Sequence, residues 1–469
     1  MSYRYGNREQ CSLLPPCIDD YVGPDDPVRA YDAFVDALDL NALGILVDDE
    51  QVGCPQYDPR TMLKLFVYGY SYGADRSSRK LERAIHHNLS FIWLLGGLRP
   101  DHKTIANFRR KYKDALAQVL KQSARMCLKL GLIDGNILFI DGTKIRANAS
   151  IKNTWNQKRV DEKLKKVDEK IEALLRECEE IDGQEEHEAS LVKLQGKLQD
   201  QQTLREKVEQ IASELQTSGR ISINTTDADC VSTKSIHGSY SGYNGQIAVD
   251  ERNGLIASCD VVSKSTDQGL LSGQVRNAEE TLDKKCSTAV ADGGYSDLED
   301  ISKINDDVTV LVPVQRKNSD VENFTYDEST NTYSCPEGHT LVYYTIDNEK
   351  KRWRYKISDA TLCQKCSRFG TCTTSKYGRT LGRMFFETIS QQVEQNLASD
   401  ESVGVYKLRA QRVEHPFGHF RRTLSVRSFL MRGVNGVKAE MSLYASVFNI
   451  RRMITLLGGV PSFIAVVSS

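Results

Sequence analysis

Three acidic residues, Asp141, Asp292 and Glu414, have the residue types and surroundings that suit divalent metal ions. The two aspartates follow the β-favouring apolar runs 137–140 and 288–291, so each carboxylate is expected at the carboxyl end of a strand. Glu414 lies in a basic segment that we expect to be helical. Two Mg²⁺ ions about 3.5–4 Å apart can activate a water or a 3′-hydroxyl at a phosphodiester, and they need hard anionic oxygen ligands. The three acids therefore predict a two-metal phosphodiester site.

The third acid has a rival. Glu440, in the segment VKAEMSLY, is also acidic, but it lacks the tyrosine and arginine neighbours that frame Glu414, so Glu414 is preferred. Taken singly, an aspartate at the end of a strand is more often a cap or turn residue than a ligand. The prediction rests on the set and on its order along the chain.

The charge distribution favours a polyanionic substrate. Lys and Arg number 62 against 63 Asp and Glu, which argues against a simple nucleic-acid coat protein. From residue 404 to 455, however, ten basic residues accompany only Glu414 and Glu440. Lys and Arg contacts to phosphates supply most non-specific affinity for nucleic acids. The alternative is a solvated helix face, and the proximity of Glu414 favours the first interpretation.

The order of elements after residue 130 predicts the fold class. Strands are expected at 137–141, 243–250, 255–263, 287–292 and 308–314, with helices at 267–284 and 296–305. Three strands, then helix, strand, helix and strand, followed by the helix of Glu414, is the order of an α/β ribonuclease-H-like mixed sheet. We assign this catalytic domain to residues 131–460.

Residues 1–130 are predicted to form a helical DNA-binding domain. Four segments between 25 and 130 show apolar recurrence at three and four residues. Asp101 is a plausible N-cap for a helix that ends in the basic residues Arg109, Arg110 and Lys111. Short helices with a basic last turn resemble a helix-turn-helix reader of DNA, although packing or dimerisation is the alternative.

Two insertions interrupt the catalytic domain. Residues 155–217 carry two apolar heptad-like arms around a polar turn, which predicts an antiparallel helical hairpin. Its sixteen acids against eleven bases favour a structural or dimer-bridging role over DNA binding. Residues 325–385 contain four cysteines spaced C-x₂₇-C-x₂-C-x₅-C, which predict a structural zinc ion; buried thiols are the alternative, and His339 could replace a ligand. The cysteines concerned are Cys335, Cys363, Cys366 and Cys372.

The start of the chain is polar, and no apolar run approaches the length of a membrane span. We therefore expect a cytoplasmic, nucleoid-associated protein that makes no membrane contact. Its thiols would be reduced or metal-bound rather than paired in disulfides.

Six ordered motifs resemble those of bacterial insertion-sequence DDE transposases with an InsH-type helical N-terminal domain. They are the two aspartate runs, the glutamate segment, YDPRTMLKLFVYGYSYG, RPDHKTIANFRR and GYNGQIAVD. The resemblance implies a transposase that binds inverted-repeat ends and performs two-metal strand cleavage and strand transfer with Mg²⁺ or Mn²⁺. It also implies double-stranded DNA as partner and a homodimer or larger synaptic complex. A stand-alone metal-dependent nuclease and a DNA-binding protein that has lost catalysis are the alternatives.

The family's third-acid signature places a tyrosine, an arginine and a later basic residue around the glutamate. Tyr406, Arg409, Glu414 and Arg421 follow it, except that four residues rather than three separate Arg409 from Glu414. One extra residue rotates a helix by about 100°, so we expect Arg421 to share the face of Glu414 and Arg409 to point elsewhere. By resemblance, the tyrosine and the later basic residue hold the phosphates of the transposon end. The predicted DNA contacts are Arg109, Arg110, Lys144, Arg146, Tyr406, Arg409, Arg421 and Arg422.

Overall fold

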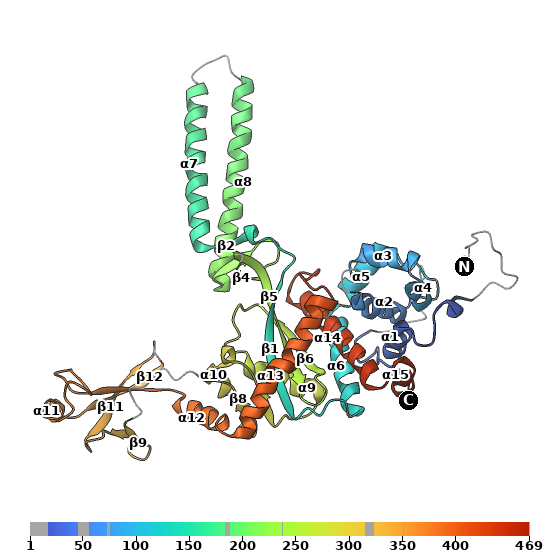
Figure 1. Ribbon diagram of the computed structural model, residues 1–469. Helices are drawn as coiled ribbons and strands as arrows, with labels where there is room; N and C mark the ends of the chain where they lie inside the picture. The colour runs from blue at the N-terminus through green and yellow to red at the C-terminus, as the bar shows by residue number, and fades with distance from the viewer. Residues whose placement is uncertain are drawn as a thin grey trace, which may run out of the picture.

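The computed structural model describes residues 17–45, 56–72, 76–182, 188–236, 238–314, 323–349 and 351–468. Its body is a mixed α/β unit around a six-stranded sheet (Figure 1). Along the sheet the order is β6-β5-β1-β7-β8, and β4 pairs with the other half of β5. β1 is antiparallel to β5 and parallel to β7, and β8 continues in parallel beside β7. The strands are β1 (Ile137–Arg146), β4 (Val231–Ser235), β5 (Gly238–Asp250), β6 (Ile256–Val262), β7 (Thr288–Val290) and β8 (Thr309–Leu311).

The predicted strands are present, and the central ones are the most apolar. Leu138, Phe139 and Ile140 of β1 are fully buried in succession, as expected for a strand covered on both faces. The helices that contact this sheet include α6 (Lys113–Lys129), α9 (Leu271–Leu282), α12 (Glu387–Asn396), α13 (Asp400–Gly418) and α14 (Val434–Leu456). The short connections η4 (Gly293–Tyr295) and α10 (Leu298–Ile301) join β7 to β8, and α12 precedes α13. α10 is shorter than the predicted helix 296–305.

The N-terminal segments are helical, as predicted, but two of them are broken. The segment around residue 88 divides at Asn88, whose side chain caps α4 by accepting from the Ser90 amide at 3.0 Å. The long segment after Asp101 divides at Tyr112, and Asp101 caps α5 by accepting from the Thr104 amide at 2.7 Å. The elements are η1 (Ile18–Tyr21), α1 (Pro27–Asp36), α2 (Pro59–Ser71), α3 (Ser78–His87), α4 (Leu89–Leu94) and α5 (His102–Lys111).

The N-terminal and C-terminal helices share one hydrophobic core with the sheet. α14 packs against α2 and α6, and α15 (Val460–Val467) packs against α1. A single cluster of buried apolar residues extends from Val22 to Phe463. The helices that begin the chain are therefore built directly onto the helices that follow the catalytic sheet.

Glu440 is fully buried at the centre of this junction. Its Oε1 accepts from the Tyr70 hydroxyl at 3.1 Å, and its Oε2 accepts from the Leu430 amide at 2.8 Å. Burial raises the pKa of Glu440, and the charges of Arg109 and Arg76 oppose that shift. The rival third acid thus joins α2 and α14 within the core.

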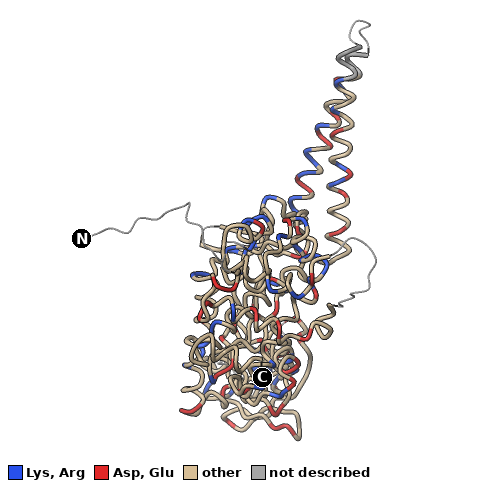
Figure 2. The backbone as a smooth tube through the Cα atoms, turned by 90° about the vertical axis from the view of Figure 1, so that its right-hand side faces the viewer, with Lys and Arg blue, Asp and Glu red and all other residues tan. Residues whose placement is uncertain are grey.

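The first insertion is a helical hairpin that projects from the body (Figure 1). α7 (Gln157–Asp182) and α8 (Glu188–Ser218) lie side by side, as predicted, on a base formed by β2 (Thr154–Asn156) and β3 (Ser222–Asn224). The 3₁₀ turn η3 (Ile151–Asn153) leads into β2. Both signs of charge alternate along the two helices (Figure 2). Val160, Val208 and Leu215 are buried at the base together with Ile223.

The second insertion is a small five-stranded antiparallel sheet of its own, in the order β13-β12-β11-β10-β9. Its tyrosine-rich core is separate from the main core. The elements are β9 (Thr325–Asp327), β10 (Thr332–Ser334), β11 (Thr340–Asp347), β12 (Arg352–Ile357), α11 (Ala360–Gln364) and β13 (Thr380–Met384).

In the described ranges, no single helix is both long and apolar enough to cross a membrane. α14 and α15 pass that test only as a pair, across a bend of 108°.

Replacing Glu440 by glutamine should lower the free energy of unfolding by about 3 kcal/mol, because Arg76 and Arg109 lose a buried counter-charge and one donor loses its acceptor. Urea unfolding of the full chain measures this. Glu214→Gln, at an exposed position of α8, is the control and should change stability by less than about 0.5 kcal/mol. Equal midpoints for the two variants would contradict the assignment of Glu440 to the core.

Candidate active site

Asp141 lies in the middle of β1, paired with Ile247 of the neighbouring β5. Its Oδ1 accepts from the Gly142 amide at 2.7 Å, and its Oδ2 accepts from the Arg409 guanidinium at 3.2 Å. Burial raises the pKa of Asp141, and the carboxylates of Asp292 and Asp267 raise it further. The Gly142 amide and Arg409 oppose that shift. Opposing electrostatic effects therefore act on the pKa of Asp141.

Asp292 follows β7 by two residues, and β7 lies parallel beside β1. The side chain caps the η4 turn, with Oδ1 accepting from the Gly294 amide at 2.8 Å. The expectation that Asp141 ends its strand is wrong, because β1 continues to Arg146. The register of β1 and β7, continued two residues past the pair of Phe139 and Val290, nevertheless places Asp141 beside Asp292. In agreement, the charge of Asp292 contributes to the raised pKa of Asp141, of which burial is the largest cause.

Glu414 lies on α13, the helix that packs against β1 and β5. The side chain is exposed, and it stands between two arginines that reach β1. Arg409 contacts Asp141, while Arg421 donates to the Thr143 hydroxyl at 2.6 Å. Arg421 lies in the π-helical turn η5 (His419–Thr423) that continues α13, and such turns often occur at functional sites. Of these three side chains, Arg409 and Arg421 are the ones that contact β1.

The expectation that Arg409 points away from the acids is wrong. Its ion pair with Asp141 at 3.2 Å is three-quarters or more shielded from solvent on both sides. The position of a residue around a helix fixes only the direction of its Cβ. A long arginine side chain can bend away from that direction and reach a carboxylate. Arg409 and Arg421 both contact β1, two residues apart on the strand.

A second group of polar side chains, which the sequence did not connect to the acids, joins the strand of Asp141 to the turn of Asp292. Asp267 Oδ1 accepts from Lys144 at 3.0 Å, Asn244 at 2.7 Å and Gln246 at 2.8 Å. Gln246 in turn accepts from the hydroxyl of Tyr295, which ends the turn after Asp292. Asn244 and Gln246 are fully buried, so they act within the sheet rather than at a DNA surface.

This network explains why the predicted helix 267–284 begins only at Leu271. Asp267 lies outside the helix, where it accepts hydrogen bonds from residues of β1 and β5. It also explains the glycine after Asp141. A Cβ at Gly142 would clash with the Gln246 amide and would lie 2.7 Å from Asp267 Oδ1 and 2.9 Å from Asn244 Oδ1.

The structure separates the predicted DNA contacts into buried and accessible residues. Arg109 is 8% exposed, donates to the Arg76 carbonyl at 2.6 Å and lies over the Phe66 ring at 5.0 Å. This burial contradicts a phosphate contact by Arg109, because its position in α5 is on the side that faces α2. Arg110 is exposed and bonds Asn107.

The four remaining predicted DNA contacts differ in their exposure and in their partners within the fold. Arg146 is exposed at the end of β1, with its guanidinium 4.8 Å from the centre of the Tyr240 ring. Lys144 is engaged by Asp267. Tyr406 is partly buried against the core, and Arg422 is exposed beside Arg421. Arg146 and Arg422 thus retain accessible positive charge, whereas Lys144 and Tyr406 are engaged within the fold.

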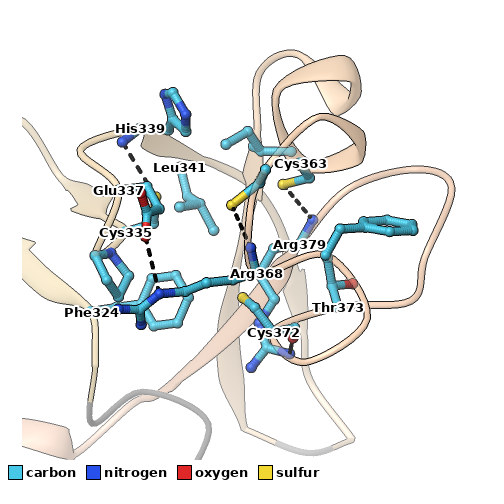
Figure 3. A pocket seen from close by; sticks show the side chains of 14 residues that line it. Phe324, Cys335, Glu337, His339, Leu341, Cys363, Arg368, Cys372, Thr373 and Arg379 are labelled. Atoms are coloured by element: carbon cyan, nitrogen blue, oxygen red, sulfur yellow. Dashed lines mark hydrogen bonds and ion pairs between the residues drawn. The ribbon is translucent and has the colours of Figure 1, made fainter.

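The four cysteines of the second insertion line one pocket of about 30 Å³ (Figure 3). Backbone amides donate to three of their sulfurs, from His339 to Cys335 at 3.3 Å, from Arg368 to Cys366 at 3.4 Å and from Arg379 to Cys363 at 3.4 Å. Burial is the largest cause that raises the pKa of Cys372. Coulombic repulsion from the other three cysteines raises it further. The four cysteines, which are separated along the sequence, therefore lie around one pocket.

Neither set of side chains forms a finished ligand cage. Within the described residues, no three His, Cys, Asp or Glu side chains are grouped so that they could hold a metal ion as they stand. The donor chemistry nevertheless fits the expected ions. Carboxylate oxygens that repel one another suit a hard divalent cation, and amide-supported thiols suit zinc.

Two family models match the chain. A Transposase DDE domain matches residues 334–454, which include Glu414, and a Transposase domain (DUF772) matches residues 16–111, which include α1 to α5. Both matched segments, 121 and 96 of the 469 residues, are transposase domains, and the match is consistent with a DDE transposase of an insertion sequence. No curated protein and no solved structure matches it.

Gly142→Ala should lower the free energy of unfolding by about 1–3 kcal/mol, because the added methyl group forces β1 away from Asp267, Asn244 and Gln246. Thermal or urea unfolding measures the loss. The control is Gly273→Ala in α9, where a Cβ meets nothing within 4 Å and alanine favours the helix. A Gly142 variant as stable as the control would show that the polar network does not constrain β1.

Proposed function

We propose that the protein is an active DNA transposase whose ribonuclease-H-like sheet holds Asp141, Asp292 and Glu414 as the ligands of two Mg²⁺ or Mn²⁺ ions. The observation that carries this proposal is the pairing of β1 with β7, with α13 laid along β1. The strand order β6-β5-β1-β7-β8, with only the first two pairings antiparallel, supports the ribonuclease-H-like assignment.

Bound divalent ions would lower the pKa of a water or 3′-hydroxyl and neutralise charge on the phosphodiester. The chain's own residues supply position and charge. Asp141 on β1 lies beside Asp292 in the turn after β7, and the Asp267 network links β1 and β5 to the end of that turn. Because positioning and electrostatics carry the reaction, no covalent intermediate with the protein is expected.

Arg409 holds Asp141 in place and offsets its repulsion from Asp292. With a divalent ion bound, the guanidinium of Arg409 would be available to a phosphate oxygen, for which its planar fork is suited. Arg421 and Arg422 follow α13 in η5, and Arg146 ends β1. We assign these four arginines to the DNA backbone at the site, with double-stranded transposon ends and target as substrates. Joining two ends together requires a dimer or larger assembly.

We further assign the four cysteines to a structural zinc ion. The amide donors to Cys335, Cys363 and Cys366 would stabilise thiolates, and one small cavity is shared by all four side chains. The insertion has only a small core of five buried residues, so a metal would add folding energy where burial supplies little.

Asp141→Asn, Asp292→Asn and Glu414→Gln should each abolish Mg²⁺- or Mn²⁺-dependent cleavage of DNA carrying the element's ends, because each removes an anionic ligand. Binding to the same DNA should remain within about threefold of the unsubstituted protein, since the carboxylates repel phosphates rather than hold them. Cleavage is followed on end-labelled duplexes, with binding measured in Ca²⁺. Near-normal cleavage by Glu414→Gln would remove Glu414 from the site.

Purified protein should contain about one zinc ion per chain, and Cys366→Ser should lose it and unfold the insertion at lower temperature. Elemental analysis in reducing buffer measures the metal. Cys178→Ser, in the helical hairpin, is the matched control and should retain the full zinc content. Absence of zinc from the unsubstituted protein would refute the site.

A further inference from the structure

The sheet of the second insertion has two chemically different faces. Side chains alternate along a strand, and β12 places Trp353, Tyr355 and Ile357 on the side of the insertion's own core. Arg352, Arg354 and Lys356 alternate with them and therefore lie on the opposite face. Strands β9 to β13 pack chiefly against one another, so no helix of the insertion covers the basic side.

Short side chains, or none in the case of glycine, flank Arg354 and Lys356 on the neighbouring strands. Arg354 is flanked by Thr345 and Gly382, and Lys356 is flanked by Val342 and Thr380. A Cβ at Gly382 would lie 2.8 Å from the Arg352 Cδ, so the glycine lets that arginine lie across β13. The three basic residues are partly buried in this sheet, and the Arg352 side chain is 20% exposed.

Within the described residues, only Arg352 of this row has an acidic partner. Arg352 Nε donates to Asp347 at 3.1 Å, which uses one side of its guanidinium. The Nε of Arg354 is buried without a hydrogen-bond partner in the described residues, and Lys356 forms no ion pair there. The described part of the insertion, 323–349 and 351–385, carries nine basic residues against six acidic ones, whereas the whole chain is slightly acidic.

The row begins where the insertion contacts the main body. Lys351, which precedes Arg352, forms an ion pair with Glu299 of α10, seven residues after Asp292. From there the strand leads away from the body as an arm beside α10 and α12 (Figure 1). DNA that enters the site past Asp292 would meet Arg352 first, then Arg354 and Lys356, at steps of about 6.8 Å along the strand.

We propose that the open face of the insertion sheet, formed by Arg352, Arg354 and Lys356, binds the phosphate backbone of the DNA duplex that extends from the active site. The identity of this duplex as transposon or target DNA rests on the proposed function, but the binding itself does not. Charge complementarity selects the partner: the row offers three cations, while the apolar side chains paired directly with it are Val342 and Met384. Contacts of this kind fix position without reading sequence.

The test compares two double variants of the full chain. Arg354→Ala with Lys356→Ala removes two of the proposed phosphate contacts, and Arg352 is kept because it pairs with Asp347. Lys365→Ala with Lys376→Ala removes the same charge from exposed positions elsewhere in the insertion. Binding to a labelled duplex of arbitrary sequence is measured by fluorescence anisotropy between 50 and 300 mM salt, roughly the range in which phosphate contacts change affinity most.

The first variant should lower the slope of log K against log salt by roughly two units, about 0.9 for each phosphate contact, while the second leaves it unchanged. Equal slopes for the first variant and the unsubstituted protein would overturn the proposal, as would equal losses in both variants. Zinc content and melting temperature verify folding, and Arg354→Gln with Lys356→Gln replaces the alanine pair if that pair unfolds. Failure of cleavage in every protein, with the slope difference intact, would contradict the proposed function alone.

Discussion

The burial of a carboxylate in the central strand, beside other acids, is the constraint on which the rest of this structure depends. Burial raises the pKa of Asp141, and Asp292 and Asp267, which come from separate segments, raise it further. Like charges held this close in a partly buried place separate unless the backbone beneath them is rigid. β1 provides that rigidity, because it is buried, paired on both sides and surrounded by the main core.

Two sets of contacts fix β1 from opposite directions. On one side, Asp267 collects hydrogen bonds from Lys144, Asn244 and Gln246, and Tyr295 extends this network to the turn of Asp292. On the other side, α13 reaches the strand through Arg409 and Arg421. The space for the first set exists only because residue 142 is glycine.

The N-terminal helices are also connected to this strand. Arg109 of α5 donates to the Arg76 carbonyl, and Arg76 donates to the Ser428 carbonyl at 2.6 Å. Ser428 forms a bridge with Arg146 at the end of β1, and the Phe429 amide donates to the Arg146 carbonyl at 2.9 Å. Hydrogen bonds and close packing thus link α5 to the strand that carries Asp141. Arg109 serves this connection rather than a DNA phosphate.

Much of the fold was predictable because its elements are local patterns. The apolar runs before Asp141 and Asp292, the cap at Asp101 and the two arms of the hairpin all depend on neighbouring residues. The Asp267 network was not predictable, because it joins residues 144, 244, 246, 267 and 295, whose polarity alone also fits exposed positions. The contact of Arg409 was missed for a related reason, since helical periodicity places a Cβ but not the end of a long side chain. The breaks at Asn88 and Tyr112 interrupt segments whose apolar spacing continues across them.

The central claim is that Asp141, Asp292 and Glu414, distant in sequence, hold the same metal ions. Iron(II) substituted for Mg²⁺ generates hydroxyl radicals in the presence of ascorbate and peroxide, and these cut the backbone next to the bound ion. Mass spectrometry of the fragments locates the cuts. The account predicts three clusters of cuts, near residue 141 in β1, near 292 after β7 and near 414 in α13, all suppressed by excess Mg²⁺. Cuts at the two aspartates with none in α13, or cuts only at other acids, would contradict it.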